Sequence, residues 1–185
     1  IIAGVKTNYS ITPNTNIRSV NWSVSNSSVK TNGSTSPSVV LETTSSGSVT
    51  LTGEILLTTG DKKTVKKTIT IQDAVLNIDG NGGVVKSILG TPEVKYQLSG
   101  VPSGAKITWQ TDNEGARRIS GQGTGTVKLD VDDIPQFRLS VTAEYGSIKK
   151  TLTKDIKVVE FLLDNMKRVS TSQYGCEMHF DAKFI

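Results

Sequence analysis

The sequence predicts an all-β protein built from two tandem immunoglobulin-like antiparallel β-sandwiches and a short C-terminal extension. Three observations predict this fold class: apolar residues recur with period two, turn-forming residues separate the apolar runs, and one series of elements occurs twice. Period two places alternate side chains on one face of a strand, and no sustained helical period occurs before residue 159. Strands of this length with turns between them are typical of a two-sheet sandwich.

The duplication is centred on the two tryptophans of the chain. Trp22 and Trp109 lie 87 positions apart, and the flanking apolar residues keep this spacing or one of 88. Register decides which face of a strand is buried, so two copies of one fold must share it. A repeat of this length corresponds to one small domain. The matched pairs include Tyr9 with Tyr96, Ile11 with Leu98, Val20 with Ile107, Val39 with Val127, Leu41 with Leu129, Leu51 with Leu139, and Ile69 with Ile156.

In the first repeat, alternation and turn residues predict each element in order. Pro13 ends an early strand, a Ser/Asn/Gly-rich loop follows the strand of Trp22, and Thr59 to Lys62 have turn chemistry. Each tryptophan is expected on a central strand, buried against the opposite sheet, where it dominates a core that is poor in aromatic residues. The predicted elements are an edge strand and turn at 1–8, strands at 9–12 and 20–25, a loop at 26–37, and strands at 39–43, 49–57 and 65–71.

The second repeat follows a short linker rich in glycine and asparagine. The boundary is expected near Gln72 and Asp73, which gives domains at 1–73 and 74–158 and an extension at 159–185. The extension has too few residues to fold alone, so it either packs on the second repeat or begins another domain. Predicted strands of the second repeat are 75–78, 84–89, 94–98, 107–110, 125–131, 137–145 and 150–158; in the extension, 161–169 has the spacing of a short amphipathic helix and 176–185 alternates again.

Composition argues against several classes of protein. The net charge of +4 is dispersed, so no basic stripe indicates a nucleic-acid partner. A single cysteine, Cys176, excludes a disulfide within the chain, although it does not exclude secretion. No stretch approaches the ~20 apolar residues of a membrane span. The chain opens at Ile1 within a strand pattern and shows no signal peptide, so we interpret it as a piece of a longer protein.

The second repeat resembles a known family of domains. It contains Gly100-Val101-Pro102-Ser103-Gly104-Ala105, then Ile107-Thr108-Trp109, the Ser/Gly-rich stretch 119–125, and a closing strand at 154–158. This series is similar to the immunoglobulin-like or PKD-like repeats of surface and secreted proteins of Bacteroidetes-type bacteria. The first repeat departs from it, with Pro13 to Asn16 in place of the Gly-Pro-Gly turn. The resemblance covers about residues 1–158 and implies spacer or adhesion modules without catalytic residues.

Residues that could carry chemistry are few. Cys176 and His179 are three positions apart on a predicted strand, so they face opposite sides and form neither a nucleophile pair nor a complete zinc site. The 77–82 linker offers alternating oxygen ligands like the start of a calcium loop, but Ile88 stands where the bidentate carboxylate is needed. Calcium and a plain turn both remain open there. A second calcium alternative is the acidic group at 130–133, with Asp112 and Glu114.

Lysines recur at matched places in both repeats. The simpler explanation is protection of a sheet edge against aggregation, and the alternative is a polyanion site. These lysines are Lys62, Lys63, Lys66 and Lys67 in the first repeat and Lys149, Lys150 and Lys154 in the second.

Together these features predict a non-catalytic structural or adhesion segment that spaces and presents neighbouring domains of the same chain. We expect no catalytic residues, cofactor or metal, no nucleic-acid partner and no direct membrane span. The expected location is the extracellular space or the outer-membrane surface of a bacterium, with a protein or a glycan on a cell surface as partner. Two alternatives are a glycan-binding accessory module, which predicts an exposed row of aromatic residues, and the non-catalytic part of a larger secreted enzyme.

Overall fold

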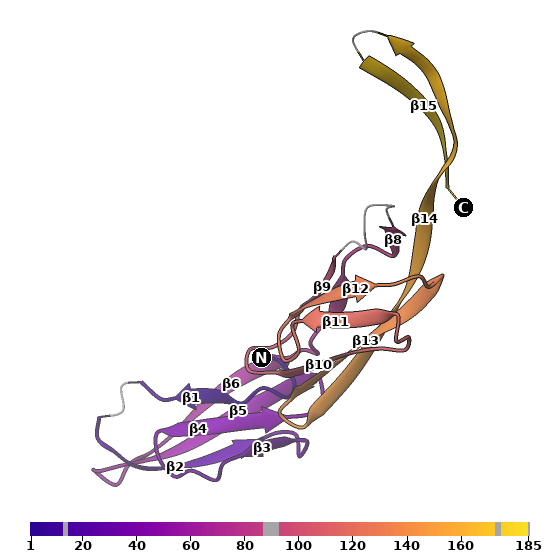
Figure 1. The fold of residues 1–185 in the computed structure, drawn as a ribbon. Coiled ribbons are helices and arrows are strands. Elements are labelled where there is room, and N and C mark those ends of the chain that lie inside the picture. Colours follow the sequence, from indigo (N-terminus) through magenta and orange to yellow (C-terminus); the bar gives the residue numbers. More distant parts are fainter. Residues whose placement is uncertain (13–14, 87–92, 173–174, 185) are drawn as a thin grey trace. The chain divides into compact units, whose positions relative to one another are not determined.

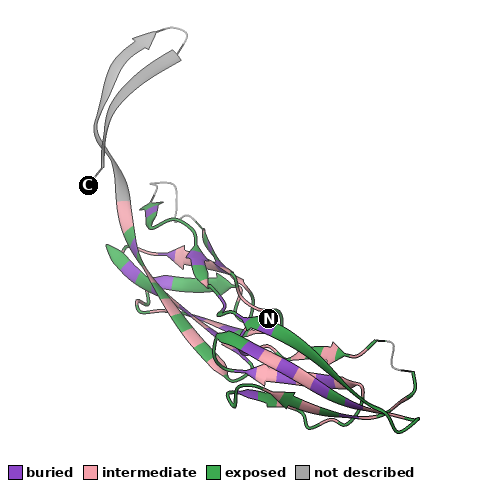
Figure 2. Cartoon of the chain, turned by 180° about the vertical axis from the view of Figure 1, so that it is seen from behind, coloured by how far each residue is buried: buried purple, intermediate pink, exposed green. Residues whose placement is uncertain are grey.

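Every regular element that the structure describes is a β-strand, which confirms the all-β class (Figure 1). A computed structural model describes the backbone of residues 1–12, 15–86, 93–172 and 175–184 and, within these, the side chains of residues 1–85 and 93–159. Buried and exposed residues alternate along most strands (Figure 2), as the period of two predicts.

Two three-stranded antiparallel sheets form the first sandwich. One sheet has the order β1-β4-β3 and the other β2-β5-β6. The core between them takes residues from both sheets, with Val39 and Leu41 from one and Leu51 and Ile69 from the other, all almost fully buried. The strands are β1 (Thr7–Ser10), β2 (Ile17–Val24), β3 (Val29–Thr31), β4 (Ser38–Thr43), β5 (Gly47–Leu57) and β6 (Lys62–Ile71).

The second sandwich repeats this order and adds strands to it. One sheet has the order β11-β12-β9-β7, and the other β10-β13-β14-β15, with β8 pairing in parallel to β14. Trp109, Tyr96 and Leu129 are among its largest fully buried side chains. The strands are β7 (Asn77–Asp79), β8 (Gly83–Lys86), β9 (Val94–Ser99), β10 (Lys106–Thr111), β11 (Ala116–Ser120), β12 (Thr126–Val131), β13 (Gln136–Tyr145), β14 (Ile148–Ser172) and β15 (Gly175–Phe184).

The duplication extends to individual hydrogen bonds. The indole N–H of Trp22 donates to the carbonyl oxygen of Ser36 at 2.9 Å, and that of Trp109 donates to Thr124 at 2.9 Å. These acceptors lie 88 positions apart, the same spacing that separates β4 from β12. In both copies the indole therefore bonds to the loop that precedes the second strand after its own, β4 or β12, and the repeat deduced from apolar spacing is a structural one.

Two sequence-based expectations about strands are wrong. The strands of the two tryptophans, β2 and β10, lie at the edges of their sheets rather than at their centres, because no further described strand pairs with either of them. The predicted loop at 26–37 contains the short strand β3, and its counterpart β11 was also missed. Both missed strands pair with one neighbour only and lie among polar residues, so their alternation is too short to detect.

The amphipathic helix predicted at 161–169 is also wrong. The backbone of this stretch continues β14 and pairs antiparallel with β15, from Phe161 opposite Phe184 to Ser172 opposite Gly175. Non-local pairing with a second strand supplies partners for the backbone groups, and this outweighs a weak helical spacing. The alternation predicted for 176–185 corresponds to β15.

The chain divides into two compact units. The first contains Ile1–Val75 with Gly100–Lys106 and Ala143–Lys150, and the second contains Leu76–Ser99, Ile107–Thr142 and Thr151–Ile185. Because two short segments of the second repeat belong to the first unit, the domain limits at 73 and 158 stay predictions.

Candidate functional site

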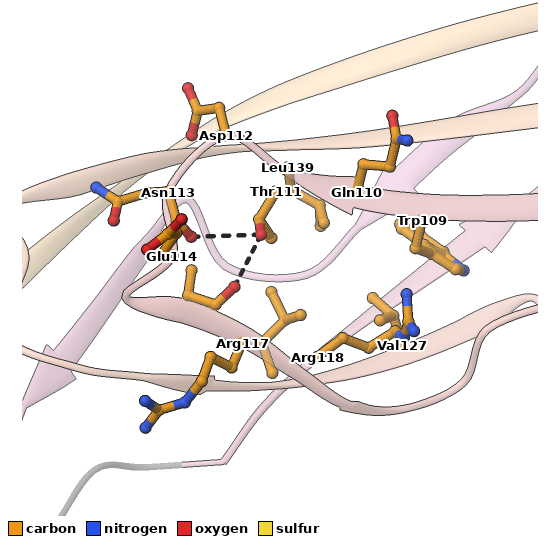
Figure 3. Close-up of a pocket in the computed structure, with 12 residues that line it drawn as sticks. Trp109, Gln110, Thr111, Asp112, Asn113, Glu114, Arg117, Arg118, Val127 and Leu139 are labelled. Atoms are coloured by element: carbon orange, nitrogen blue, oxygen red, sulfur yellow. Dashed lines mark hydrogen bonds between the residues drawn. The ribbon is translucent and has the colours of Figure 1, made fainter.

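A hollow of about 460 Å³ in the second sandwich lies beside Trp109, between the end of β10 and β11 (Figure 3). Apolar core residues form one wall and polar loop residues the other. Its lining consists of Trp109, Gln110, Thr111, Asp112, Asn113, Glu114, Ala116, Arg117, Arg118, Val127, Leu129 and Leu139.

A tight turn positions the polar wall of this hollow. The Oδ1 atom of Asn113 accepts the backbone N–H of Gly115 at 2.9 Å. The Thr111 hydroxyl donates to the carbonyl oxygen of Ala116 at 2.8 Å and to that of Asn113 at 3.4 Å, and Figure 3 shows Thr111 directed towards Asn113. Such side-chain bonds to the backbone are the reason that Asn and Thr are frequent in turns. Trp109 is only 1% exposed and its N–H is used within the fold, so its ring offers no face on which a sugar could stack.

Two carboxylates of the acidic group at 130–133 share an internal cation. Leu129 and Val131 point into the core, so the carboxylates of Asp130 and Asp132 share the opposite face, as expected. The guanidinium of Arg117 lies 3.4 Å from Asp130 and 2.9 Å from Asp132. A cation already bridges these carboxylates, and no group of three potential metal ligands occurs among the residues whose side chains are described.

The 77–82 linker is likewise occupied by the protein's own groups. The side-chain amide of Asn77 donates to the carboxylate of Asp79. The Lys154 ammonium donates to the carbonyl oxygens of Ile78 at 3.2 Å and Gly80 at 2.6 Å. Lys154 thus places a positive charge against this segment, and Asn77 already uses the Asp79 carboxylate, so the arrangement favours the turn over the calcium loop.

Arg138 and Asp155 form an ion pair on the open face of the second sandwich, beside a hollow of about 670 Å³. Nε of Arg138 lies 2.6 Å from Oδ1 of Asp155, and the hydrogen bond from the guanidinium holds the pKa of the Asp155 carboxyl below its usual value. The backbone N–H of Arg138 also donates to Asp112 at 2.7 Å. Exposed ion pairs of this kind contribute little stability, and an ion pair alone does not mark a catalytic acid or base.

The matched lysines have different surroundings in the two repeats. On the exposed strand β6, which is an edge of its sheet, Lys62, Lys63 and Lys66 fit the predicted protection of an edge. In the second repeat, Lys150 and Lys154 instead donate to backbone carbonyls, Lys150 to Ala74 at 3.0 Å. The explanation by edge protection is therefore wrong for Lys150 and Lys154, which hold an adjacent chain segment in place.

A smaller hollow of about 250 Å³ lies in the first sandwich between β1 and β6. Trp22 lines it and is only partly buried, so the expectation of a fully buried indole holds for Trp109 and fails for Trp22. Tyr9 is partly exposed too, and the ammonium of Lys67 stands 5.4 Å from the centre of its ring. The remaining lining residues are Ser10, Ile11, Thr12, Leu51, Val65 and Lys66.

The sequence did not predict this hollow, because its lining comes from residues 9–12, 22, 51 and 65–67, which are distant from one another in the chain. The side chains of Cys176 and His179 lie outside the described residues, so the interpretation of that pair stays a prediction. No described helix is long and apolar enough to cross a membrane.

Comparisons with known proteins show only a general likeness. No family model and no curated protein sequence matches the chain. Its structural neighbours are immunoglobulin-like and cadherin-like tandem domains. The D00-D0 domain of intimin is 14% identical with a TM-score of 0.35, covering 85% of this chain and 93% of its own. Extracellular domains 3–5 of Drosophila OTK are 12% identical with a TM-score of 0.37, covering 99% and 70%.

The EC1–4 fragment of PcdhgB3 is another neighbour, 12% identical with a TM-score of 0.33 over 76% of this chain; the alignment spans 40% of that fragment. At such scores the likeness extends to the class of fold alone. The assignment of tandem β-sandwiches therefore rests on the strand order described above.

Proposed function

We propose that the chain is a non-catalytic segment of a bacterial cell-surface or secreted protein, in which two tandem immunoglobulin-like, PKD-like modules space and present neighbouring domains and contact protein partners. One observation carries this proposal: the same pair of three-stranded sheets, β1-β4-β3 with β2-β5-β6 and β9-β12-β11 with β10-β13-β14, occurs twice in succession. Proteins that need length and resistance to unfolding repeat a self-contained unit in this way.

The pairing within each unit suits a load-bearing element. In the first module β5 pairs with β6 without interruption from Gly47 opposite Ile71 to Leu56 opposite Lys62. A long antiparallel ladder resists extension because its hydrogen bonds must break together when the strands are sheared. The modules have no disulfide to limit their extension, since the chain has a single cysteine. Strand pairing and core packing therefore have to supply the resistance.

Pulling single molecules by their two ends tests this proposal. We expect two separate unfolding events, each releasing about 25–30 nm of chain, because about 80 extended residues span ~3.3–3.6 Å each. The variant Trp109→Ala is the internal control and should weaken one event only. Smooth extension at low force, or a single event for the whole chain, would contradict a role as two spacer modules. The same traces would place the module limits, which we propose at 73 and 158, with 159–185 as an extension.

Glycan binding is a second candidate, and one observation favours it. Tyr9 and Trp22 are both partly exposed and line one hollow, and aromatic rings are the usual platforms for sugars. The ring of Tyr9, however, is already covered by Lys67. A glycan array read through Trp22 fluorescence in the Trp109→Phe variant separates the two functions, because only a glycan-binding module should respond.

A further inference from the structure

A side chain closes the edge of β10 at the place where a neighbouring strand would lie. Within the described chain, β10 pairs with β13 on one side only. On the other side, the backbone N–H of Trp109 donates to Oε1 of Gln122 at 3.0 Å. An edge N–H of a sheet otherwise points to solvent or to another strand. The amide oxygen of Gln122 therefore takes the place of a carbonyl oxygen from a neighbouring strand.

The first sandwich closes its matching edge from the same position in the chain. There the backbone N–H of Val20 on β2 donates to the carbonyl oxygen of Thr35 at 2.9 Å. Thr35 and Gln122 lie 87 positions apart, which is the spacing of the repeat. The acceptor is a backbone carbonyl in one copy and a side-chain amide in the other. Closure of this edge by the loop is therefore a property of both modules, achieved with different groups.

Short-range contacts hold Gln122 in position within residues 121–124, which we call the capping loop. Gly121 has a φ of +98°, and a Cβ there would overlap the carbonyl oxygen of Thr126, so this position requires glycine. The backbone N–H of Thr124 donates to the carbonyl oxygen of Gly121 at 3.1 Å. The hydroxyl of Thr124 lies 2.9 Å from that oxygen and 2.7 Å from the carbonyl oxygen of Thr126. The loop is thus folded back on itself, with Gln122 directed at the edge of β10.

The strand under the capping loop has no charged residue to protect it. The stretch from Ile107 to Thr111 contains no Asp, Glu, Lys or Arg, whereas β6 carries four lysines between positions 62 and 67. Uncharged segments with β-branched and aromatic residues are prone to pair with strands of other chains. In a twofold pair of identical strands, like side chains come close together, so a charged strand repels its own copy. The stretch 107–111 has no such repulsion.

We propose that the capping loop prevents β10 from pairing with β10 of a second copy of this chain. When the loop leaves the edge, the two strands pair antiparallel about a twofold axis at Trp109. The N–H of each Trp109 then donates to the Trp109 carbonyl oxygen of the other copy, which replaces Oε1 of Gln122. Both strands present the same surface, so the dimer is closed and symmetric.

This role is independent of the spacer function, and either could fail without the other. The first measurement is the hydrogen exchange of the Trp109 amide in the full chain, followed by NMR. Gln122→Ala removes the acceptor, so this exchange should become about fivefold faster or more. The matched control is Gln97→Ala on β9. Gln97 is exposed, and its side chain makes no hydrogen bond within the described residues, so the exchange should not change.

Self-association tests the second part of the proposal. The double variant Gln122→Ala/Thr124→Ala also removes the hydroxyl contacts that hold the loop. Analytical ultracentrifugation should show a dimer at concentrations at which the unmodified chain is monomeric. Adding Thr108→Lys places two like charges beside the twofold axis and should weaken the dimer by about tenfold or more. Circular dichroism would establish that all variants are folded.

Three results would overturn the proposal. One is exchange of the Trp109 amide at the same rate in Gln122→Ala and in the unmodified chain. Another is a double variant that stays monomeric at every concentration measured. The last is a dimer that Thr108→Lys does not weaken, because its interface would then lie away from β10.

Discussion

Trp22 and Trp109 occupy the same place in two copies of one fold, yet only Trp109 is buried. Each indole donates to the same loop carbonyl at the same distance. One difference at a matched position lies beside the ring: a Cβ at Gly53 would lie 3.1 Å from Cζ3 of Trp22, and the counterpart of Gly53 in the second copy is Val141. The same tryptophan therefore contributes differently to the free energy of unfolding in the two copies, because its burial depends on the neighbouring residues.

The largest expected effect is on the buried indole. Trp109→Ala should destabilise the second sandwich by about 3–5 kcal/mol, because it removes a large fully buried side chain and leaves a cavity. Trp22→Ala should cost the first sandwich less, about 1–3 kcal/mol, because part of the ring already contacts solvent. Scanning calorimetry, with one transition assigned to each sandwich, measures both. Equal losses in the two variants would contradict the difference in packing.

A second prediction exchanges the residues that face the two rings. Gly53→Val introduces the side chain present at position 141, and a Cβ at Gly53 would lie 3.1 Å from Cζ3 of Trp22. The ring must therefore move outward, and overpacking of this kind costs about 1–3 kcal/mol. We expect a lower melting temperature and a red-shifted emission of Trp22 in the Trp109→Phe background. Unchanged emission would mean that Gly53 does not set the position of the ring.

The matched lysines provide a third prediction. Lys154→Met should destabilise the second sandwich by about 1–2 kcal/mol, because it removes the charged donor of two hydrogen bonds to backbone carbonyls. Lys67→Met keeps most of the aliphatic packing and removes only a contact over the ring of Tyr9, so we expect less than about 0.5 kcal/mol. Urea denaturation of both variants measures the contrast. A larger loss for Lys67→Met would contradict the different roles of these two matched lysines.

The smallest effect at neutral pH concerns the two tyrosines. Burial raises the pKa of Tyr96 to about 12 from its ordinary value of 10, and it raises the pKa of Tyr9 as well. The ionised phenolate is disfavoured in the folded protein. The stability that depends on a neutral tyrosine is therefore fully present below pH 10 and is lost as the pH rises towards 12. Stability measured against pH should therefore fall less steeply in Tyr96→Phe than in the unmodified chain. Parallel curves would show that Tyr96 does not titrate on unfolding.

The sequence was informative where apolar residues alternate over long stretches. The spacing between Val39 and Leu41, repeated at Val127 and Leu129, correctly predicted β4 and β12 and the register of the duplication. Short polar strands such as β3 and β11 could not be predicted, because three to five residues carry too little alternation. The helix expected at 161–169 failed because its backbone pairs with β15, which local spacing does not describe.

The sequence also predicted only part of each candidate site. The carboxylates and lysines could be located in the sequence, but the groups that they contact could not. Arg117 lies on a different strand from Asp130 and Asp132, and Lys154 is 74 positions from Gly80. Whether an acidic group binds a metal ion or an internal cation depends on such distant pairs, so the tertiary structure was needed to favour the internal cation at both places.

The sequence by itself determined that this protein is a duplicated sandwich of β-strands, because period-two alternation and a constant offset are properties of the chain alone. Only the tertiary structure decided which matched residues are buried and which lysines hold a backbone segment. The physical reason is that burial and hydrogen bonding are properties of pairs of groups that are distant in the chain.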